Sequence, residues 1–286
     1  GYASNHILVA ALAPLAEAVL VDESAHYCVL EAARVSGLPV ALFRHRDPDD
    51  LARQARGRGR VLVMADAVAP ATGLLAPVME YLGALGDSER AWLLLDDAHG
   101  FGVLGEAGRG RWDELGLWPR VNEWPSADGV NLHVGGTLSK ALGGFGGIIP
   151  GTREFLGRVR TASHYFAGAS APAAAVAGAT AKALEIVCCE PLLRSRLREN
   201  SNHLRSALRG FGLVVPEGAT AQIGVSIGDA AHMRRIHEEL KARGILVPYF
   251  GAYSGLPPEG VLRFAVFATH SREQIERLLA ALAALL

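Results

Sequence analysis

The sequence predicts an α/β fold, with a mostly parallel sheet in a large domain and a smaller α+β domain at the C-terminus. Short apolar runs of strand length, such as residues 91–95, alternate with longer segments of helical periodicity through the first half of the chain. Polar residues directly follow several of these runs, as is typical where parallel strands end in binding turns. We place the large domain at residues 1–172, and the connecting helices and small domain at residues 173–286.

The individual elements follow from hydrophobic periodicity and from the residues that begin and end helices. Strands are predicted at residues 19–22, 39–43, 60–64, 91–95, 130–134, 147–150, 221–227 and 261–266. Helices are predicted at residues 10–20, 29–36, 173–186, 191–211, 231–243 and 271–286. The arginine-rich stretch 45–59 is expected to form a surface helix and turn with a solvated charged face.

The composition argues against several classes of protein. Half of the 286 residues are hydrophobic and the formal net charge is only -1, which favours neither nucleic acid nor an anionic membrane as a partner. The apolar run 10–20 is too short to cross a bilayer, so we expect no membrane segment. The cysteines Cys28, Cys188 and Cys189 have the spacing of neither a disulfide framework nor a zinc site. A reducing cytoplasm is therefore the expected compartment.

A glycine-rich stretch at residues 135–147 carries a lysine, Lys140, between two glycine clusters. The hydroxyls of Thr137 and Ser139 precede it and are suited to holding a phosphate. Because Ser139 comes before Lys140, the order is the reverse of that in a Walker loop, and nucleotide hydrolysis is not favoured. Two interpretations remain: a glycine-rich turn with a solvated lysine, or a lysine that forms a Schiff base with an aldehyde cofactor.

The second interpretation requires an acid that protonates the ring nitrogen of the cofactor, at the end of another strand. Asp96 meets this requirement because it directly follows the apolar run 91–95, and His99 lies in the same turn. A carboxylate and an imidazole thus accompany the lysine segment. This combination favours cofactor chemistry over a solvated turn.

Residues 96–110 and 136–143 together resemble two motifs of the α-oxoamine synthase family, in the order and spacing of that family. The family belongs to the fold-type I pyridoxal-phosphate enzymes, and its members include 8-amino-7-oxononanoate synthase and serine palmitoyltransferase. The resemblance implies pyridoxal 5'-phosphate as cofactor, an amino acid and an acyl-CoA as substrates, and an acyltransferase reaction that condenses the two. It also implies a homodimer whose active site lies at the subunit interface.

The resemblance implies a role for each of several residues. Lys140 would form the Schiff base and then act as general base, Asp96 would keep the ring nitrogen protonated, and His99 would bind the phenolic oxygen. His26 would stack on the ring, although an isolated histidine is more often a helix cap or a core residue. Arg263 would bind the carboxylate of the amino acid, because a planar guanidinium suits bidentate pairing.

Gly1 and Tyr2 resemble a glycine-aromatic pair that in the family lies against the cofactor phosphate at a helix N-terminus. The implied phosphate site therefore comprises Gly1, Tyr2, Thr137 and Ser139. In the family this pair lies well inside the chain. We therefore expect about a hundred N-terminal residues of the family to be absent from this sequence.

The chain departs from the family at Pro70, where relatives often have a serine near the cofactor. It also departs at Ala167 and Gly168, where relatives present polar side chains to the neighbouring subunit. Two alternative functions stay open: a class I/II aminotransferase with the same lysine and aspartate, or a catalytically degenerate homologue that acts as a subunit. His232 and His237 share a predicted helix without a third ligand, so no metal site is predicted.

Overall fold

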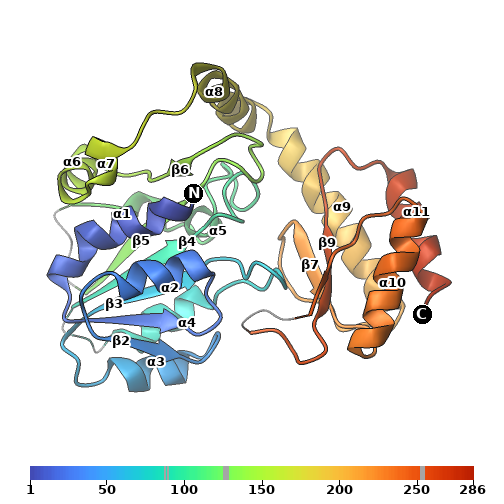
Figure 1. Ribbon diagram of the computed structural model, residues 1–286, viewed down its shortest axis with the longest axis horizontal. Coiled ribbons are helices and arrows are strands. Elements are labelled where there is room, and N and C mark those ends of the chain that lie inside the picture. Colours follow the sequence, from blue (N-terminus) through green and yellow to red (C-terminus); the bar gives the residue numbers. More distant parts are fainter. Residues whose placement is uncertain (87, 89, 125–128, 252–254) are drawn as a thin grey trace. The chain divides into compact units, whose positions relative to one another are not determined.

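The computed structural model describes residues 1–286 except 87, 89, 125–128 and 252–254. The chain divides into two compact units, each made of two segments of the sequence. The first comprises Gly1–Val68 and Ala76–Cys188, and the second comprises Ala69–Leu75 and Cys189–Leu286 (Figure 1). The domain boundary expected between residues 172 and 173 stays a prediction.

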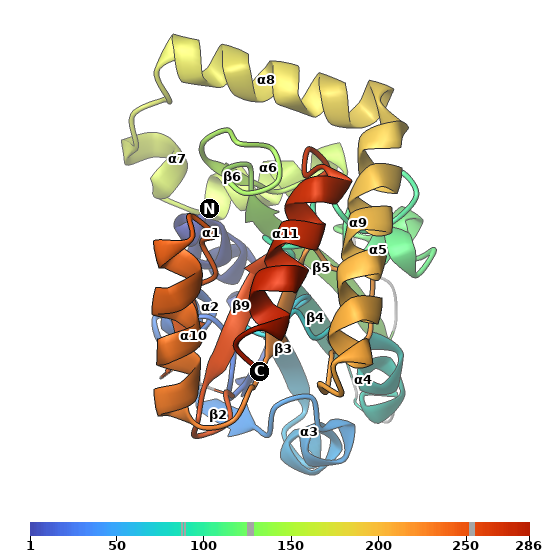
Figure 2. The same ribbon diagram turned by 90° about the vertical axis from the view of Figure 1, so that its right-hand side faces the viewer.

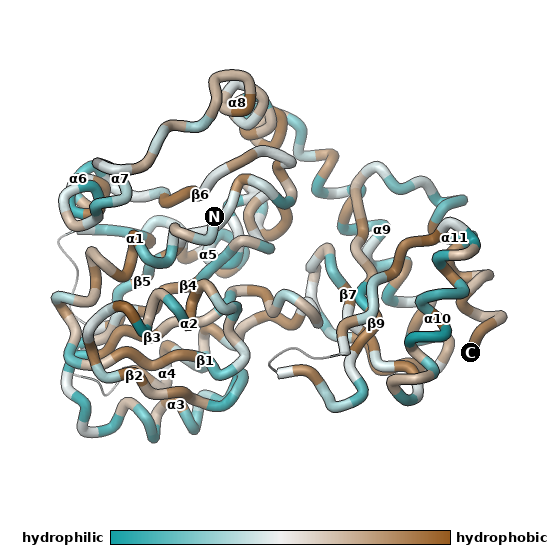
Figure 3. Tube along the Cα trace, in the orientation of Figure 1, coloured by the Kyte–Doolittle hydropathy of each residue, from teal (hydrophilic) through white to brown (hydrophobic). Residues whose placement is uncertain are grey.

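The first unit is built on a six-stranded sheet in the order β2-β1-β3-β4-β5-β6. The strands are β1 (Ala18–Asp22), β2 (Val40–Phe43), β3 (Arg60–Asp66), β4 (Arg90–Asp96), β5 (Val130–Thr137) and β6 (Gly147–Ile148). The first five are parallel, and β6 is antiparallel to β5. β1, β3 and β4 are almost entirely buried and apolar, as strands covered on both faces require (Figure 3). The predicted α/β class with a mostly parallel sheet is confirmed.

Helices cover both faces of this sheet (Figure 1 and Figure 2). The helices of this unit are α1 (Tyr2–Leu12), α2 (Tyr27–Arg34), α3 (Pro48–Ala55), α4 (Val78–Ala84), α5 (Arg111–Glu114), α6 (Arg153–Ala162), α7 (Tyr165–Gly168) and α8 (Ala174–Cys189). α1 packs with α2 and α6, and α3 packs with α4. Val19 and Leu62 join the apolar core beneath α1 and α2, whereas their neighbours Leu20 and Val63 point to the opposite face.

The helix predicted at residues 10–20 is wrong. α1 ends at Leu12, a 3-10 turn spans Ala13–Leu15, and β1 begins at Ala18. The proline at position 14 cannot continue a helix, because it has no backbone N–H to donate. The apolar run nevertheless continues through β1, because this strand is buried on both faces. A strand of this kind has the same composition as a buried helix, and the sequence pattern does not distinguish the two.

The second unit is an α+β structure, as predicted. Its antiparallel sheet has the order β7-β9-β8, with β7 at Gln222–Val225, β8 at Tyr249–Phe250 and β9 at Val261–Ala265. Three helices share an apolar core with this sheet: α9 (Pro191–Gly210), α10 (Ala230–Ala242) and α11 (Arg272–Ala283). Ser271 begins α11 in a capping box with Gln274, which explains why this helix starts where the sequence predicts.

The loop 69–75 belongs to the second unit because it pairs with the backbone of β7. The backbone N–H of Gly224 donates to the carbonyl oxygen of Thr72 at 2.9 Å, and the hydroxyl of Thr220 donates to the carbonyl oxygen of Gly73 at 3.1 Å. A Cβ on Gly224 would lie 2.6 Å from the Ala71 carbonyl oxygen, so glycine is needed for this close approach.

Two observations concern both units. In the part of the chain that the structure describes, no helix combines the length and the apolar character needed to cross a lipid bilayer. The cysteines are free thiols, with Cys28 buried and both Cys188 and Cys189 exposed.

Candidate active site

The carboxyl ends of four neighbouring strands hold polar residues. Asp22, Asp66, Asp96 and Thr137 are the last residues of β1, β3, β4 and β5. Because these strands are parallel, their carboxyl ends lie at one edge of the sheet, and Asp66 is the direct neighbour of Asp96 in the register. The sheet therefore gathers side chains that are far apart in the sequence. This edge is the candidate active site.

Asp96, the predicted partner of the ring nitrogen, is only 7% exposed. Its Oδ1 accepts a hydrogen bond from the backbone N–H of Ala98 at 2.9 Å, and its Oδ2 accepts one from Nδ2 of Asn5 at 2.6 Å. Asn5 is buried on α1, and sequence reasoning missed it. The signal that could have found it is an amide among the buried apolar residues of α1, which include Leu8 and Leu12. The two bonds fix the orientation of the carboxylate.

Lys140 and His99 come from different turns, after β5 and after β4, and they meet in the structure. Nζ of Lys140 lies 2.7 Å from Nε2 of His99. A lysine ammonium can only donate, so Nε2 accepts the hydrogen bond. Burial lowers the pKa of His26, Asp96 raises it, and Lys140 lowers it, so both charged groups lie near this imidazole. The structure thus brings together the four residues predicted to be catalytic.

Gly1, Thr137 and Ser139 form a group that we call the phosphate cradle. Gly1 is the N-cap of α1, whose first backbone N–H groups have no carbonyl partner within the helix. A Cβ on Gly1 would lie 2.6 Å from both Cβ and Oγ1 of Thr137, so this helix end and β5 are in close contact. The hydroxyls of Thr137 and Ser139 are 2.7 Å apart. A helix N-terminus next to two hydroxyls is suited to binding a phosphate.

His26 is the N-cap of α2. Its Nδ1 accepts a hydrogen bond from the backbone N–H of Cys28 at 3.2 Å, and its own backbone N–H donates to Oδ2 of Asp66 at 2.7 Å. Burial and the charge of Asp96 raise the pKa of Asp66, whereas the bond from His26 lowers it. The two interpretations of His26 are compatible, because capping uses a nitrogen at the ring edge whereas stacking would use the ring face.

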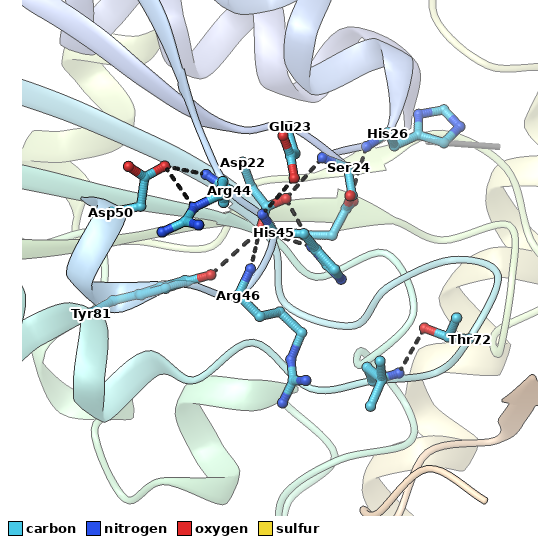
Figure 4. Close-up of polar contacts among 12 residues, drawn as sticks. Asp22, Glu23, Ser24, His26, Arg44, His45, Arg46, Asp50, Thr72 and Tyr81 are labelled. Carbon is cyan, nitrogen blue, oxygen red and sulfur yellow. Dashed lines mark hydrogen bonds and ion pairs between the residues drawn. The ribbon is translucent and has the colours of Figure 1, made fainter. Parts of the chain in front are cut away.

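A buried carboxylate, Asp22, holds the turn between β1 and α2 (Figure 4). Its Oδ1 accepts hydrogen bonds from the backbone N–H of Ser24 and from Nδ1 of His45, both at 2.9 Å. Its Oδ2 accepts from the backbone N–H of Arg46 at 3.2 Å and from the hydroxyl of Tyr81 at 3.4 Å. Asp22 thereby ties this turn to the turn after β2 and to α4, and so fixes the backbone that leads into α2.

Asp97 has a structural role that the sequence did not predict. Its side chain is fully buried, and its Oδ2 accepts a hydrogen bond from the backbone N–H of Arg111 at 2.5 Å. A Cβ on Gly100 or on Gly110 would collide with this carboxylate, so both positions require glycine. Burial raises the pKa of Asp97 to about 7, although the bond from Arg111 lowers it. Asp97 closes the loop 97–111, which carries His99.

Two other predicted binding residues are placed differently. Tyr2 is 50% exposed, and its hydroxyl donates to Oε2 of Glu31 at 2.6 Å, so its role in cofactor binding stays a prediction. Arg263 lies on β9 of the second unit, where its Nη1 donates to the carbonyl oxygen of Pro70 at 3.2 Å. Its guanidinium carbon lies 4.6 Å from the centre of the Phe250 ring. The role of Arg263 in carboxylate binding stays a prediction.

The residues of the first unit fit pyridoxal 5'-phosphate group by group. Lys140 offers a primary amine to the aldehyde, Asp96 a fixed carboxylate to the ring nitrogen, and His99 an imidazole to the phenolic oxygen. The phosphate cradle offers N–H and hydroxyl donors, and its contact at Gly1 leaves no room for a larger residue. Among the described residues, no group of three or more His, Cys, Asp or Glu side chains could hold a metal ion.

Known proteins share this sequence and fold. The chain matches the aminotransferase class I and II family over residues 1–282. It is 34% identical to an 8-amino-7-oxononanoate synthase of Thioalkalivibrio sulfidiphilus, over 99% of this chain and 70% of that protein. It is 36% identical to the enzyme of the same name from Methylococcus capsulatus, over 99% of this chain and 71% of that protein.

Solved structures agree with these relatives. Sphingomonas wittichii serine palmitoyltransferase has a TM-score of 0.86 at 26% identity, over 99% of this chain and 70% of that chain. The 8-amino-7-oxononanoate synthase of Francisella tularensis shares the fold, with a TM-score of 0.78 at 18% identity, over 99% of this chain and 80% of that chain. The chain therefore belongs to the aminotransferase class I and II family of fold-type I pyridoxal-phosphate enzymes, on its α-oxoamine synthase branch.

Proposed function

We propose that this chain condenses an amino acid with an acyl-CoA thioester on pyridoxal 5'-phosphate, with Lys140 as the covalent anchor of the cofactor. The observation that carries the proposal is the contact of 2.7 Å between Nζ of Lys140 and Nε2 of His99. Lys140 and the buried Asp96 both shift the pKa of His26, so they lie close to the same imidazole. When bound, the cofactor supplies an electron-withdrawing ring that stabilises negative charge on the α-carbon of the amino acid. The condensation releases coenzyme A, and decarboxylation follows in most of the family.

The residues of the site would share the binding and proton-transfer work. Asp96 holds a proton on the ring nitrogen, because a nearby carboxylate favours the charged form of a base. The amine of Lys140 would take up the proton that leaves the α-carbon of the amino acid. His99 hydrogen-bonds the phenolic oxygen, and His26 covers one face of the ring. The phosphate cradle, together with the backbone of Tyr2, binds the phosphate.

Arg263 is proposed to bind the carboxylate of the amino acid substrate. Its Nε is buried and has no hydrogen-bond partner among the described residues, which supports a ligand there. The ring of Phe250 and the carbonyl oxygen of Pro70 hold the guanidinium in place. Burial lowers the pKa of Arg263, but an arginine side chain stays charged at neutral pH and can pair with a carboxylate.

The apolar helix α8 supports a homodimer. Its residues are mostly alanine and other small or apolar side chains (Figure 3). Thr180 is nevertheless its one buried residue among those described. Exposed apolar surface of this kind is typical of interfaces. The hydroxyl of Thr180 accepts a hydrogen bond from the backbone N–H of Phe145 at 3.1 Å, so a partner on α8 would contact the element that supports the Lys140 turn. Because the cysteines are free, we also place the protein in the reducing cytoplasm.

The anchor is tested by mixing the purified protein with pyridoxal 5'-phosphate and recording the visible absorption band of the lysine adduct. We expect the band in the wild type and in Lys241→Ala, which removes an exposed lysine on α10, and its loss in Lys140→Ala. A wild type that takes up no cofactor, or a Lys140→Ala variant with an unchanged band, would contradict the proposal.

The acyltransferase reaction is tested separately from the anchor. Release of free coenzyme A is measured with a thiol reagent after glycine, alanine or serine is added together with a series of acyl-CoA thioesters. An aminotransferase with the same anchor would form the adduct and convert a keto acid, but it would release no coenzyme A. A degenerate homologue would show neither reaction.

A further inference from the structure

The thiol of Cys28 lies between three groups of the candidate active site. Cys28 is in the first turn of α2 and is only 4% exposed. Its Sγ lies 2.9 Å from Nδ1 of His26, 3.3 Å from Nδ2 of Asn5 and 3.5 Å from Oδ2 of Asp96. The same sulfur thus contacts the residue proposed to stack on the ring, the residue proposed to bind the ring nitrogen, and the amide that orients the latter.

The donors and acceptors of this cluster are determined by chemistry. The backbone N–H of Cys28 can only donate, and it donates to Nδ1 of His26, so Nδ1 presents a lone pair. The amide Nδ2 of Asn5 also only donates, so Sγ is its acceptor. The thiol proton of Cys28 is then available to Nδ1 of His26 or to Oδ2 of Asp96, both of which accept.

Burial favours the neutral forms of both the thiol and the imidazole. Burial, followed by the charges of Asp96 and Asp66, raises the pKa of Cys28 to about 12, so the sulfur keeps its proton. Burial lowers the pKa of His26; Asp96 and Glu31 raise it, whereas Lys140 lowers it. At neutral pH the imidazole is therefore uncharged, and its proton lies on Nε2.

The tautomer matters for the proposed ring contact. A neutral imidazole can lie flat against a protonated pyridine ring without charge repulsion, whereas an imidazolium would repel it. The orientation matters as well, because Nδ1 accepts a hydrogen bond from the backbone N–H of Cys28 at 3.2 Å and lies 2.9 Å from the thiol of the same residue. The ring of His26 is thereby fixed before any cofactor arrives.

We propose that Cys28 is a positioning residue, whose thiol and backbone N–H fix His26 as the neutral tautomer with an unprotonated Nδ1, and whose sulfur links His26 to Asn5 and Asp96. The inference deepens the proposed function, on which the stacking role of His26 rests. The tautomer is nevertheless a property of the chain itself. It can be measured without cofactor, so a failure of this inference is distinguishable from a failure of the proposed function.

The first test is 15N NMR of the histidine side chains in the whole chain without cofactor, with the His26 signals assigned through His26→Asn. We expect a pyridine-type Nδ1 in the wild type and in Cys28→Ser, whose hydroxyl replaces the thiol as donor. In Cys28→Ala we expect a partial shift towards the pyrrole-type Nδ1 and faster ring motion. A protonated Nδ1 in the wild type, or identical spectra in wild type and Cys28→Ala, would overturn the proposal.

The second test is the affinity for pyridoxal 5'-phosphate, followed by absorption. Loss of one buried hydrogen bond should weaken binding roughly three- to tenfold in Cys28→Ala, and Cys28→Ser should restore it. Val35→Ala is the control, because Val35 ends the same helix and is 69% exposed, and it should bind as the wild type does. If Cys28→Ala does not fold, Cys28→Ser decides alone: a changed tautomer there refutes the proposal, and a retained one supports it. Equal affinities of wild type and folded Cys28→Ala would also refute it.

Discussion

Replacement of Asp97 by asparagine tests how strongly the contribution of the loop 97–111 to the stability of the protein depends on pH. The variant keeps the shape of the side chain and an oxygen that can accept the bond from Arg111, but it cannot ionise. Oδ1 of Asp97 is buried and has no hydrogen-bond partner among the described residues, so nothing on that side stabilises a charge. This explains why burial dominates and raises the pKa of Asp97 from 3.8 to about 7.

The magnitude follows from linkage between protonation and folding. A rise from 3.8 to about 7 is about three pH units, and each unit corresponds to about 1.4 kcal/mol, which gives about 4 kcal/mol. The pKa of Asp97 is raised in the folded state, so the free energy of unfolding falls as the pH rises. Below about pH 4 the carboxyl is protonated in both states, and the contribution to stability is fully present. As the pH rises towards 7, the unfolded chain loses the proton first, and the contribution is lost.

We therefore expect the free energy of unfolding of the wild type to fall, relative to Asp97→Asn, by about 4 kcal/mol between about pH 4 and pH 7.5. The assay is urea unfolding at several pH values, without cofactor and at one ionic strength. The difference between wild type and variant removes the contributions of other groups, such as Asp66, whose pKa is also raised. Parallel curves for the two proteins, or a wild type that gains stability over the variant as the pH rises, would refute the reasoning.

Two further predictions concern Asn5 and Arg205. Asn5→Leu keeps the volume of the side chain but leaves Oδ2 of Asp96 without its amide donor. Cofactor binding measured by absorption should therefore weaken roughly tenfold or more. An unchanged affinity would show that the bond does not orient the carboxylate. Arg205, which is 2% exposed, donates to the carbonyl oxygens of Pro216, Thr220 and Gln222 and to the Thr220 hydroxyl. Arg205→Met should therefore destabilise the protein by about 3 kcal/mol in thermal unfolding. Arg209→Met is the exposed control. Equal losses of stability in the two variants would contradict a special role for the buried guanidinium.

The sequence by itself determined where most of the long buried strands form and which chemistry the chain carries. Strands such as β3 and β4 were predictable because a strand covered on both faces must be apolar along its length, and this composition is visible locally. The same rule produced the error at residues 10–20, where a helix end and a buried strand share one composition. Lys140, Asp96 and His99 could be found because glycine-rich and acidic turns at strand ends are also local signals.

Only the tertiary structure decided which side chains meet. Asn5 and Cys28 are unremarkable in the sequence, yet the packing of α1 and α2 against the sheet brings both to Asp96. Asp96 and Asp97 are adjacent and have the same side chain. Backbone geometry alone directs the Asp96 carboxylate into the candidate active site and buries the Asp97 carboxylate within the loop 97–111. Local composition fixes secondary structure, whereas these contacts depend on the order and register of distant strands. No pattern along the chain records that order.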